Sequence, residues 1–402
     1  MERQSNGSAR LGVSLYPYML KFKRPAGTSR GFYTEKQTFL IRLTSPEMPD
    51  CVGWGECGPM PKLSIDEQKH DTIRPEHIYL DILTRFCQIF DRPEYASYTL
   101  ETLYSTPNVW QNILDCILPT TNTHSRDDVC LSQLPALAFG IETALRDLCN
   151  GGQQQLFDTS FSKGETSLLT HGLIWMDTVE GLLTQVDQKV AVGFRVIKMK
   201  VGALLFEDEL KLLTEIRRRY PPEQITLRLD ANGAYTPESA LSILEQLAPL
   251  DIHFLEQPIP AGNWQEMAAI CAQSPIPIAL DEELIGPINP SLRRELLQTI
   301  RPQHIVIKPT LLGGFTVCEQ WIDDATEVGC EWWINSLLES NVGLNALCQW
   351  TSLLETAQEQ RIHGMGTGTL FANNIPAPIA LDGNRLRYQT SPTSKWNFSK
   401  IT

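Results

Sequence analysis

Five charged residues close short apolar runs in the second half of the chain, and their types suggest acid–base chemistry at a metal. They are Lys200, Asp230, Glu256, Asp281 and Lys308, each 25 to 30 residues after the one before. One βα unit takes about 30 residues, so the five are expected to end successive strands. Three carboxylates in one partly buried place repel one another unless a cation joins them, and all-oxygen ligation suits Mg²⁺, with Mn²⁺ as a substitute. Asp230, Glu256 and Asp281 are therefore the predicted metal ligands.

Two lysines flank these acids in strand order, and both are candidates for moving protons. Lys200 shares one face of its strand with Lys198, two residues earlier. Lys308 ends an apolar run, where burial is expected to lower its pKa toward the range useful to a general base. A lysine could then remove the proton on the α-carbon of a bound carboxylate, while the cation neutralises the resulting enediolate. The residues predict proton abstraction followed by racemisation or β-elimination.

The elements that must position these residues are β-rich runs that alternate with amphipathic helical runs. Several are apolar until their last residues, as expected for parallel strands covered on both faces. The alternation predicts an α/β fold, a (β/α)8 TIM-type barrel over 162–370, with its active site at the carboxyl ends of the strands. The eight expected strands are 168–176, 196–201, 225–231, 252–258, 276–283, 304–310, 330–338 and 361–366.

Signals for helix ends support this alternation. Thr236, Pro237 and Glu238 supply a cap, a proline in the first turn and an acid near the amino end. Another helix opens with acids at 207–209 and closes with arginines at 217–219, which opposes the helix dipole at both ends. The arginine run is therefore interpreted as a helix end.

The first 161 residues follow a different pattern, which predicts an α+β capping domain with an active-site loop. Strand-like runs at 12–22, 38–44 and 52–57 precede helical ones. The segment 23–31 between them, rich in Gly, Ser and basic residues, is either a hairpin loop or a lid over the site. The segment 371–402 leaves the barrel pattern and is expected to return to the capping domain.

Composition narrows the class of protein. The net charge of −13 over 402 residues disfavours nucleic acid and anionic membranes as partners. No apolar run approaches the roughly 18 residues of a membrane span, and the polar start lacks the apolar core of a signal peptide. Ten cysteines without a CxxC pair predict reduced thiols and a cytoplasmic protein. The expected partner is a small-molecule carboxylate, with no nucleic acid and no membrane, and the oligomeric state stays open.

Taken together, the motifs resemble the enolase superfamily, in its muconate lactonizing branch. Within that branch the chain looks most like the o-succinylbenzoate synthase family, and the likeness covers nearly the whole chain. A capping-domain match is GWGE at 53–56, and NSLLESNVG at 335–343 is near the family's serine-rich turn. The matching barrel segments are IKMKVG at 197–202, LRLDANG at 227–233, LEQP at 255–258, ALDE at 279–282 and IKPT at 307–310.

The resemblance implies a lyase that dehydrates 2-succinyl-6-hydroxy-2,4-cyclohexadiene-1-carboxylate to o-succinylbenzoate in menaquinone or phylloquinone biosynthesis. It implies Mg²⁺ on the three acids, and Lys200 as the base that also returns the proton to the departing hydroxyl. Lys308 would stabilise the enediolate by charge and cation–π contact, and Lys198 and Arg228 would tune Lys200. Further substrate-binding or neighbouring residues implied are Asn232, Glu282, Asn335, Ser336, Gly366 and Thr367.

One departure and three alternatives follow from this comparison. Where the family has three serines, the chain has Asn335, Ser336 and Leu337, and a leucine side chain cannot hydrogen-bond a succinyl carboxylate. The glycine-rich segment 366–368 either offers N–H groups to a carboxylate or is a plain turn.

N-succinylamino acid racemases use the same acids and lysines, so these positions leave synthase and racemase open. A dipeptide epimerase is less favoured, because the acidic pair expected after the eighth strand is absent, and a non-catalytic barrel predicts a lost ligand or lysine, whereas all are present.

Overall fold

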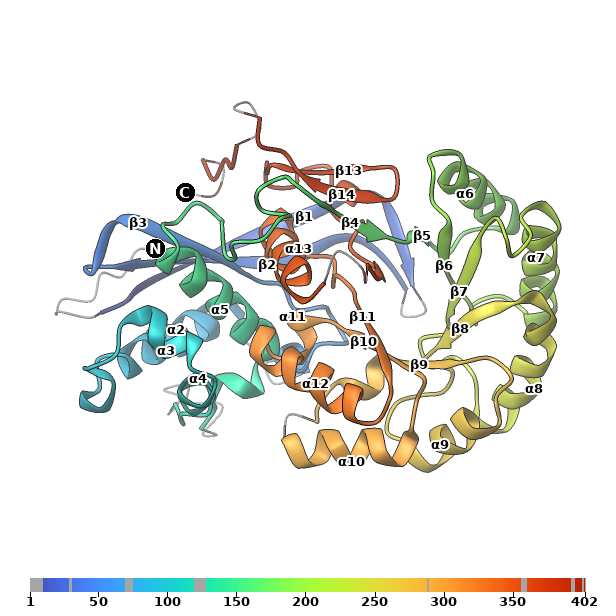
Figure 1. The fold of residues 1–402 in the computed structure, drawn as a ribbon, viewed down its shortest axis with the longest axis horizontal. Coiled ribbons are helices and arrows are strands. Elements are labelled where there is room, and N and C mark those ends of the chain that lie inside the picture. Colours follow the sequence, from blue (N-terminus) through green and yellow to red (C-terminus); the bar gives the residue numbers. More distant parts are fainter. Residues whose placement is uncertain are drawn as a thin grey trace.

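The computed structural model describes residues 10–28, 31–68, 75–118, 128–287, 289–355, 360–391, 395–399 and 401. It contains a three-stranded antiparallel sheet with helices beside it and a curled parallel sheet surrounded by helices (Figure 1). A third sheet, of four strands, joins the two ends of the parallel sheet to the last part of the chain. The predicted α/β barrel with an α+β capping domain is confirmed.

The parallel sheet has seven strands in sequence order, each paired with the next. The barrel is closed by β12 (Ile362–His363). On one side, a parallel bridge between Asn335 and Gly364 joins the residues just after β11 and β12, and on the other side β12 pairs with β4 (Ser167–Thr170). The seven strands are β5 (Gly172–Ile174), β6 (Val196–Lys200), β7 (Thr226–Asp230), β8 (Ile252–Glu256), β9 (Ile278–Leu280), β10 (His304–Ile307) and β11 (Glu331–Ile334).

The first expected strand, 168–176, is two strands rather than one. β4 pairs with β12 and with β14, whereas β5 pairs only with β6. His171 lies between them, and its backbone N–H donates to the carbonyl oxygen of His363 at 2.8 Å. One apolar run therefore serves two sheets, which its hydrophobic pattern alone does not indicate.

Helices cover the outer face of the barrel, as the figure shows for α6 to α10 (Figure 1). Thr236 caps α8 by accepting the N–H of Ser239, and Arg217 in the last turn of α7 donates to Leu250 and Asp251 carbonyls. Both predicted helix ends are confirmed. The helices are α6 (Val179–Ala191), α7 (Phe206–Arg219), α8 (Pro237–Leu247), α9 (Trp264–Gln273), α10 (Pro290–Ile300), α11 (Pro309–Leu312), α12 (Phe315–Glu327) and α13 (Asn341–Leu354), with 3-10 turns η3 (Ala248–Leu250), η4 (Glu282–Leu284) and η5 (Gly368–Leu370).

The capping domain is built on the antiparallel pairs β1–β2 and β2–β3. Within this domain β3 packs closely against α5, where Gly53 and Gly55 are needed because a Cβ atom on either would lie 2.0 Å from a backbone oxygen of α5. Its elements are β1 (Gly12–Thr28), β2 (Gly31–Ser45), β3 (Met48–Cys57), α1 (Ile65–Gln68), α2 (Pro75–Ile89), α3 (Leu100–Ser105), α4 (Pro107–Leu114) and α5 (Pro135–Cys149), with 3-10 turns η1 (Pro93–Tyr95) and η2 (Leu131–Gln133).

The segment 23–31 is mostly strand. β1 continues to Thr28 and β2 begins at Gly31, with an irregularity in their register between Lys21 and Ala26. Ser29 and Arg30 lie outside the described residues. The hairpin interpretation is therefore confirmed for the described part of the segment.

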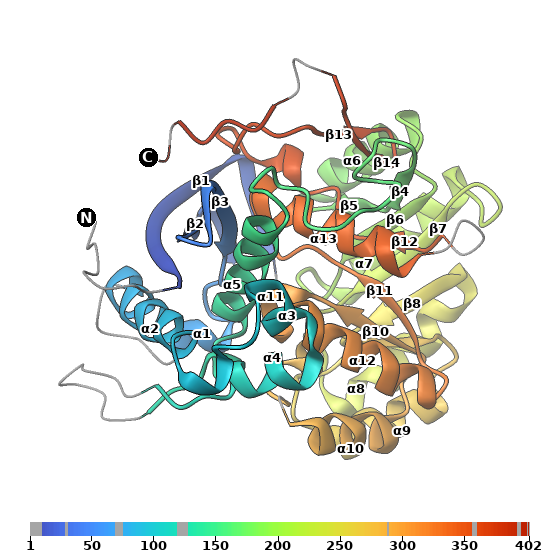
Figure 2. The same cartoon turned by 60° about the vertical axis from the view of Figure 1, so that its left-hand side comes forward.

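The last part of the chain contacts both units. Phe371 bridges Phe22 of β1, and the hairpin of β13 (Ile379–Asp382) and β14 (Arg385–Tyr388) adds to β4. Farther on, Phe398 stacks on Trp54 of β3 with ring centroids 4.6 Å apart. Figure 2 shows this red segment passing from the barrel to the side of the β1–β3 sheet.

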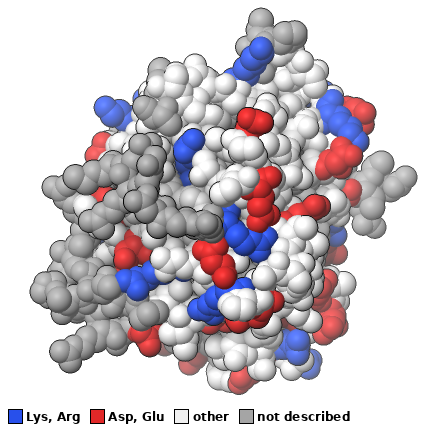
Figure 3. All heavy atoms as spheres, turned by 90° about the vertical axis from the view of Figure 1, so that its left-hand side faces the viewer, with Lys and Arg blue, Asp and Glu red and all other residues white. Residues whose placement is uncertain are grey.

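On the face shown in Figure 3, acidic and basic side chains of the described residues are interspersed and form no continuous basic area. The apolar cores lie inside the barrel wall and between the antiparallel sheet and its helices. Across the described ranges, we find no helix with the length and apolarity that crossing a membrane requires.

The buried carboxyl of Asp147 in α5 makes the stability of the capping domain depend on pH. It accepts hydrogen bonds from the backbone N–H groups of Trp54 and Gln154, at 2.8 and 2.5 Å, and burial raises its pKa to about 6 from 3.8. A raised carboxyl pKa means that stability present below pH 4 is lost as the pH rises through about 6.

Asp147→Asn removes this titration. The free energy of unfolding of the variant minus that of the wild type is therefore expected to rise by about 3 kcal/mol between pH 4 and pH 7. Chemical denaturation followed by tryptophan fluorescence measures this difference. A difference that does not change with pH would contradict the assignment, whatever constant loss the substitution itself causes.

Candidate active site

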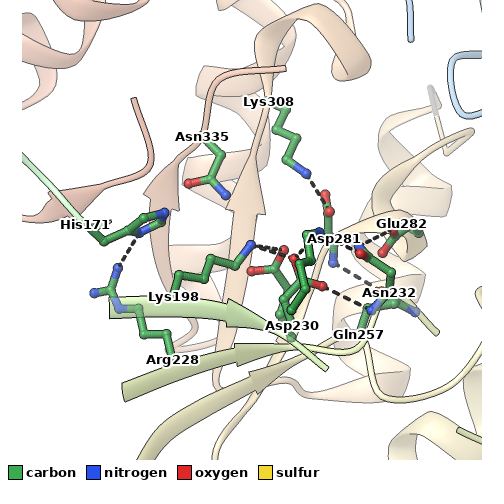
Figure 4. A network of polar contacts seen from close by, with 12 residues as sticks. His171, Lys198, Arg228, Asp230, Asn232, Gln257, Asp281, Glu282, Lys308 and Asn335 are labelled. Carbon is green, nitrogen blue, oxygen red and sulfur yellow. Dashed lines mark hydrogen bonds and ion pairs between the residues drawn. The ribbon is translucent and has the colours of Figure 1, made fainter. Parts of the chain in front are cut away.

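The strand register brings the predicted residues to one end of the barrel. Lys200 pairs with Asp230, and Asp230 pairs with Glu256, so these three lie level on β6, β7 and β8. Glu256 pairs with Ala279, which places Asp281 two residues farther along, after β9 ends. Lys308 directly follows β10. The structure thus gathers the two lysines and three acids at the carboxyl ends of five adjacent strands. Figure 4 shows Asp230, Asp281 and Lys308 of this group.

Ammonium groups neutralise the acids in this arrangement. Lys198 Nζ donates to Asp230 Oδ2 at 2.7 Å and to Glu256 Oε1 at 2.8 Å, and all three side chains are buried. Lys200 Nζ donates to the same Asp230 oxygen at 2.7 Å, and Lys308 Nζ forms an ion pair with Asp281 Oδ2. Lys198 therefore holds two acids together, and Lys200 and Lys308 approach the group from opposite sides in strand order.

These contacts set the protonation of the group. Burial would raise the pKa of the Asp230 carboxyl, but Lys198 and Lys200 hold it well below its ordinary value. Burial and then the charge of Asp230 raise the pKa of Glu256. Burial would lower the pKa of Lys308, yet Asp281 and Glu256 outweigh it and raise that pKa. The expected lowering at Lys308 is therefore wrong in this structure, because its strand is apolar but its tip meets carboxylates.

The three acids have the chemistry of a site for a hard cation. One oxygen of Glu256, Oε2, is buried and has no hydrogen-bond partner within the described part of the chain, and an orphaned buried oxygen is a typical place for an ion. Three carboxylates without His or Cys suit Mg²⁺. As the side chains stand, the described residues contain no group of three or more His, Cys, Asp or Glu close enough to hold a metal, because lysine ammonium groups lie among the acids. The three carboxylates are suitable ligands for Mg²⁺, and their coordination of this ion stays a prediction.

Two side chains beyond the acids fix the loops that carry them. Asn232, at φ +45°, accepts from Lys200 Nζ at 2.6 Å and donates to Glu282 at 2.9 Å. Gln257, at φ +42°, accepts from the backbone N–H groups of Asp281 and Glu283 at 3.1 and 3.2 Å. Non-glycine residues with positive φ are uncommon and collect at functional sites. Sequence reasoning missed Gln257, although it lies in the LEQP segment.

The lysines face a small chamber of about 100 Å³ that adjoins a larger cavity of about 570 Å³. The chamber is lined by Lys198, Lys200, Lys308 and Asp281, among others. The larger cavity lies against the 22–26 part of β1 and against Phe32 of β2. The capping-domain hairpin therefore lines the larger cavity, and its role as a lid over the site stays a prediction.

Arg228 lies deeper in the barrel than expected for a residue that tunes Lys200. Its Nη1 donates to the carbonyl oxygen of Ile362 at 2.8 Å and lies 3.5 Å from His171 Nδ1 (Figure 4). Burial, followed by the charges of Arg228 and Lys198, holds the pKa of His171 well below its ordinary value. His171 lines both cavities and was missed, although an ionisable side chain inside the apolar run 168–176 was a signal.

The turn after β11 and the segment after β12 form the opposite wall. Asn335 accepts from Trp333 Nε1 at 3.0 Å, and Thr367 Oγ1 donates to Ser336 Oγ at 2.8 Å. The backbone N–H of Gly366 already donates to Thr170 Oγ1 at 3.0 Å. This N–H group is thus already hydrogen-bonded, and a role of the segment 366–368 in holding a substrate carboxylate stays a prediction.

Comparison with known proteins gives one family and several relatives. The family described as Enolase C-terminal domain-like matches residues 181–392. An o-succinylbenzoate synthase from Desulfotalea psychrophila is 41% identical over 91% of this chain and 96% of its own. An N-succinyl-L-Arg/Lys racemase from Bacillus cereus is 23% identical over 83% and 81%.

Solved structures of other proteins also resemble this chain. The crystal structure of MenC from Desulfotalea psychrophila has a TM-score of 0.71 and 36% identity, and covers 94% of this chain and 99% of its own. The L-Ala-D/L-Glu epimerase from Bacillus subtilis has a TM-score of 0.73 at 19% identity, covering 96% and 98%. The second likeness concerns the fold alone.

Proposed function

This chain belongs to the enolase superfamily, and from that premise we propose that it is a magnesium-dependent lyase that dehydrates 2-succinyl-6-hydroxy-2,4-cyclohexadiene-1-carboxylate to o-succinylbenzoate. The observation that carries the proposal is the 41% identity to an o-succinylbenzoate synthase over nearly the full length of both chains. The gathered lysines and acids support the same chemistry, because Lys200, Lys308 and Asp281 line one chamber and the other two acids contact Lys198 beside it.

In this proposal Asp230, Glu256 and Asp281 hold Mg²⁺. A bound Mg²⁺ supplies positive charge that polarises the substrate carboxylate and makes the adjacent C–H bond more acidic. Glu256 Oε2, which is buried and has no hydrogen-bond partner among the described residues, supports a cation at this place.

Lys200 is the proposed base. In its neutral amine form, Lys200 Nζ donates to Asp230 and Asn232, and its lone pair takes the proton from ring carbon 1, next to the carboxylate, so that it becomes an ammonium. The electron pair left on that carbon forms the new ring double bond as the hydroxyl leaves carbon 6. Lys200 returns its proton to the departing hydroxyl, so one water leaves and the ring becomes aromatic. The Lys308 ammonium, reaching in from β10, stabilises negative charge on the other side of the substrate.

The racemase alternative uses the same groups differently. Racemisation of an N-succinylamino acid needs one lysine to remove the α-proton and the other to deliver a proton to the opposite face. Lys200 and Lys308 approach the acids from strands on opposite sides of them, which suits that reaction as well. The segment 364–368 after β12 has no acidic pair to hold an amino group, which favours this second candidate over a dipeptide epimerase.

An absorbance assay tests the proposal. Purified protein with Mg²⁺ is expected to aromatise the cyclohexadiene carboxylate rapidly, to stop when EDTA is added, and to recover when Mg²⁺ is restored in excess. A parallel polarimetric assay on N-succinyl amino acids measures the alternative. Racemisation without aromatisation would contradict the proposed substrate, and aromatisation that EDTA does not affect would contradict the metal.

A further inference from the structure

A buried lysine of the capping domain that the proposed reaction does not use contacts the wall of the chamber. Lys36 in β2 is 2% exposed, and its Nζ donates to the backbone carbonyl oxygens of Leu337 at 2.8 Å and Leu338 at 3.1 Å. Both leucines line the chamber that holds Lys200 and Lys308. Burying an ammonium group is costly unless it is paired and hydrogen-bonded, so this contact is a specific link between the sheet and the barrel.

The turn that Lys36 contacts is held in an unusual conformation. Leu338 has φ +62°, a left-handed value that a leucine rarely adopts unless its surroundings impose it. Next to it, the buried Glu339 accepts from the Leu337 N–H at 2.8 Å, from Ser336 Oγ, and from Thr310 Oγ1 at 2.6 Å. The turn 336–339 is therefore held from the capping side by an ammonium and from the barrel side by a carboxylate.

A second capping-domain side chain holds the residues that follow. Glu56 in β3 accepts from the backbone N–H groups of Ser340 and Gly343, at 2.8 and 2.9 Å, and from Thr38 Oγ1 of β2 at 2.8 Å. Glu56 therefore links the beginning of α13 directly to the antiparallel sheet by hydrogen bonds.

The network reaches three strand ends of the barrel. Thr310 follows Lys308 by two residues after β10, Ser336 follows β11, and Thr367 follows β12 and donates to Ser336. By contrast, Lys200 and Asp230 lie on β6 and β7, away from these strands in the sheet order. The capping sheet is thus connected to the wall that faces the substrate and not to the proposed base.

We propose that Lys36 is a positioning residue that fixes the 336–339 turn as the substrate-facing wall, so that the capping sheet sets the affinity for substrate. This inference rests on the proposed function above. Loss of the ammonium frees two carbonyl oxygens and leaves Glu339 and Glu56 without a nearby buried cation, so the turn relaxes. Substrate binding weakens, while proton removal by Lys200 is largely kept.

The test is Lys36→Met, which removes the charge and keeps a long side chain. KM for the cyclohexadiene carboxylate is expected to rise about 10-fold or more, with kcat changed by less than about threefold. The dissociation constant for o-succinylbenzoate, measured by calorimetry, is expected to weaken in parallel. This split between KM and kcat is not the signature of a general loss of stability.

Glu142→Gln is the matched control. Glu142 in α5 is also a buried charge between the capping domain and the barrel, but it accepts from Phe315 N and Thr316 Oγ1 at the start of α12. The Glu142→Gln variant is expected to have the KM of the wild type, even if its unfolding midpoint falls as far as that of the Lys36→Met variant. An equal rise in KM in both variants would overturn the inference.

A second variant covers a failure to fold. Lys36→Gln keeps one amide donor without the charge, and it is expected to raise KM to an intermediate value. If folded Lys36→Met has the KM and product affinity of the wild type, the role of Lys36 is overturned. If Lys36→Met does not fold, the same result for Lys36→Gln overturns it. Wild-type protein that neither dehydrates the substrate nor binds the product would instead overturn the proposed function, so the two failures are distinguishable.

Discussion

Replacing Lys200 by alanine is expected to lower kcat/KM for dehydration by about 10⁴-fold. The side chain of Lys200 reaches the chamber from β6 and is held by Asp230 at 2.7 Å and Asn232 at 2.6 Å, so the lone pair of its neutral amine form is fixed where a proton must be received. Alanine leaves no group on that side of the acids with a proton-accepting nitrogen at the same place. The absorbance change on aromatisation measures the loss.

The control for this prediction is a lysine with no access to the chamber. Lys211 in α7 is exposed and forms a surface ion pair with Asp208 at 3.3 Å. Lys211→Ala is expected to keep wild-type activity within about twofold, because exposed ion pairs contribute little. Substantial dehydration by Lys200→Ala would mean that the base has been assigned to the wrong lysine.

Asp281→Asn is expected to abolish both metal binding and turnover. Asp281 is the acid that follows β9, and it pairs with Lys308 across the chamber. The substitution removes one of three carboxylate ligands and leaves the Lys308 ammonium without its partner. Mg²⁺ affinity is expected to fall by at least about 100-fold and kcat/KM by about 10³-fold. Calorimetric titration with Mg²⁺ and the absorbance assay measure the two effects separately.

A surface aspartate serves as the matched control. Asp187 in α6 pairs with Arg219 at 3.0 Å far from the strand ends, and Asp187→Asn is expected to bind Mg²⁺ and turn over substrate as the wild type does. If Asp281→Asn bound Mg²⁺ normally while losing turnover, the acid would have another role, and the ligand set would need to be revised.

The sequence predicted the barrel and its polar strand ends because both depend on local patterns. Apolar runs of strand length repeat with helical runs, and a residue that ends one parallel strand lies beside the residue that ends the next. That logic placed Lys200, Asp230 and Glu256 level with one another, as the pairing of β6, β7 and β8 confirms. The same local patterns identified Gly53 and Gly55 only as part of a motif, because the contact of these glycines with α5 joins segments that are far apart in the chain.

The sequence could not predict contacts between segments far apart in the chain. Lys36 and Leu337 are 301 residues apart, and Glu56 and Ser340 are 284 apart, so no local pattern joins them. The direction of the Lys308 pKa shift was misjudged for a different reason, because the apolar strand was weighed and the charges of the predicted neighbours Asp281 and Glu256 were not. The split of β4 from β5 depends on pairing with the last strands of the chain.

The central claim is that this site removes the α-proton of the cyclohexadiene carboxylate and expels its hydroxyl, in preference to racemising an N-succinyl amino acid. Proton NMR in D₂O of the Mg²⁺-loaded protein with both compounds in one tube follows the two reactions together. We expect aromatic signals of o-succinylbenzoate to appear while the α-proton signal of the N-succinyl amino acid is still largely present. Loss of that α-proton signal with no aromatic product would contradict the central claim.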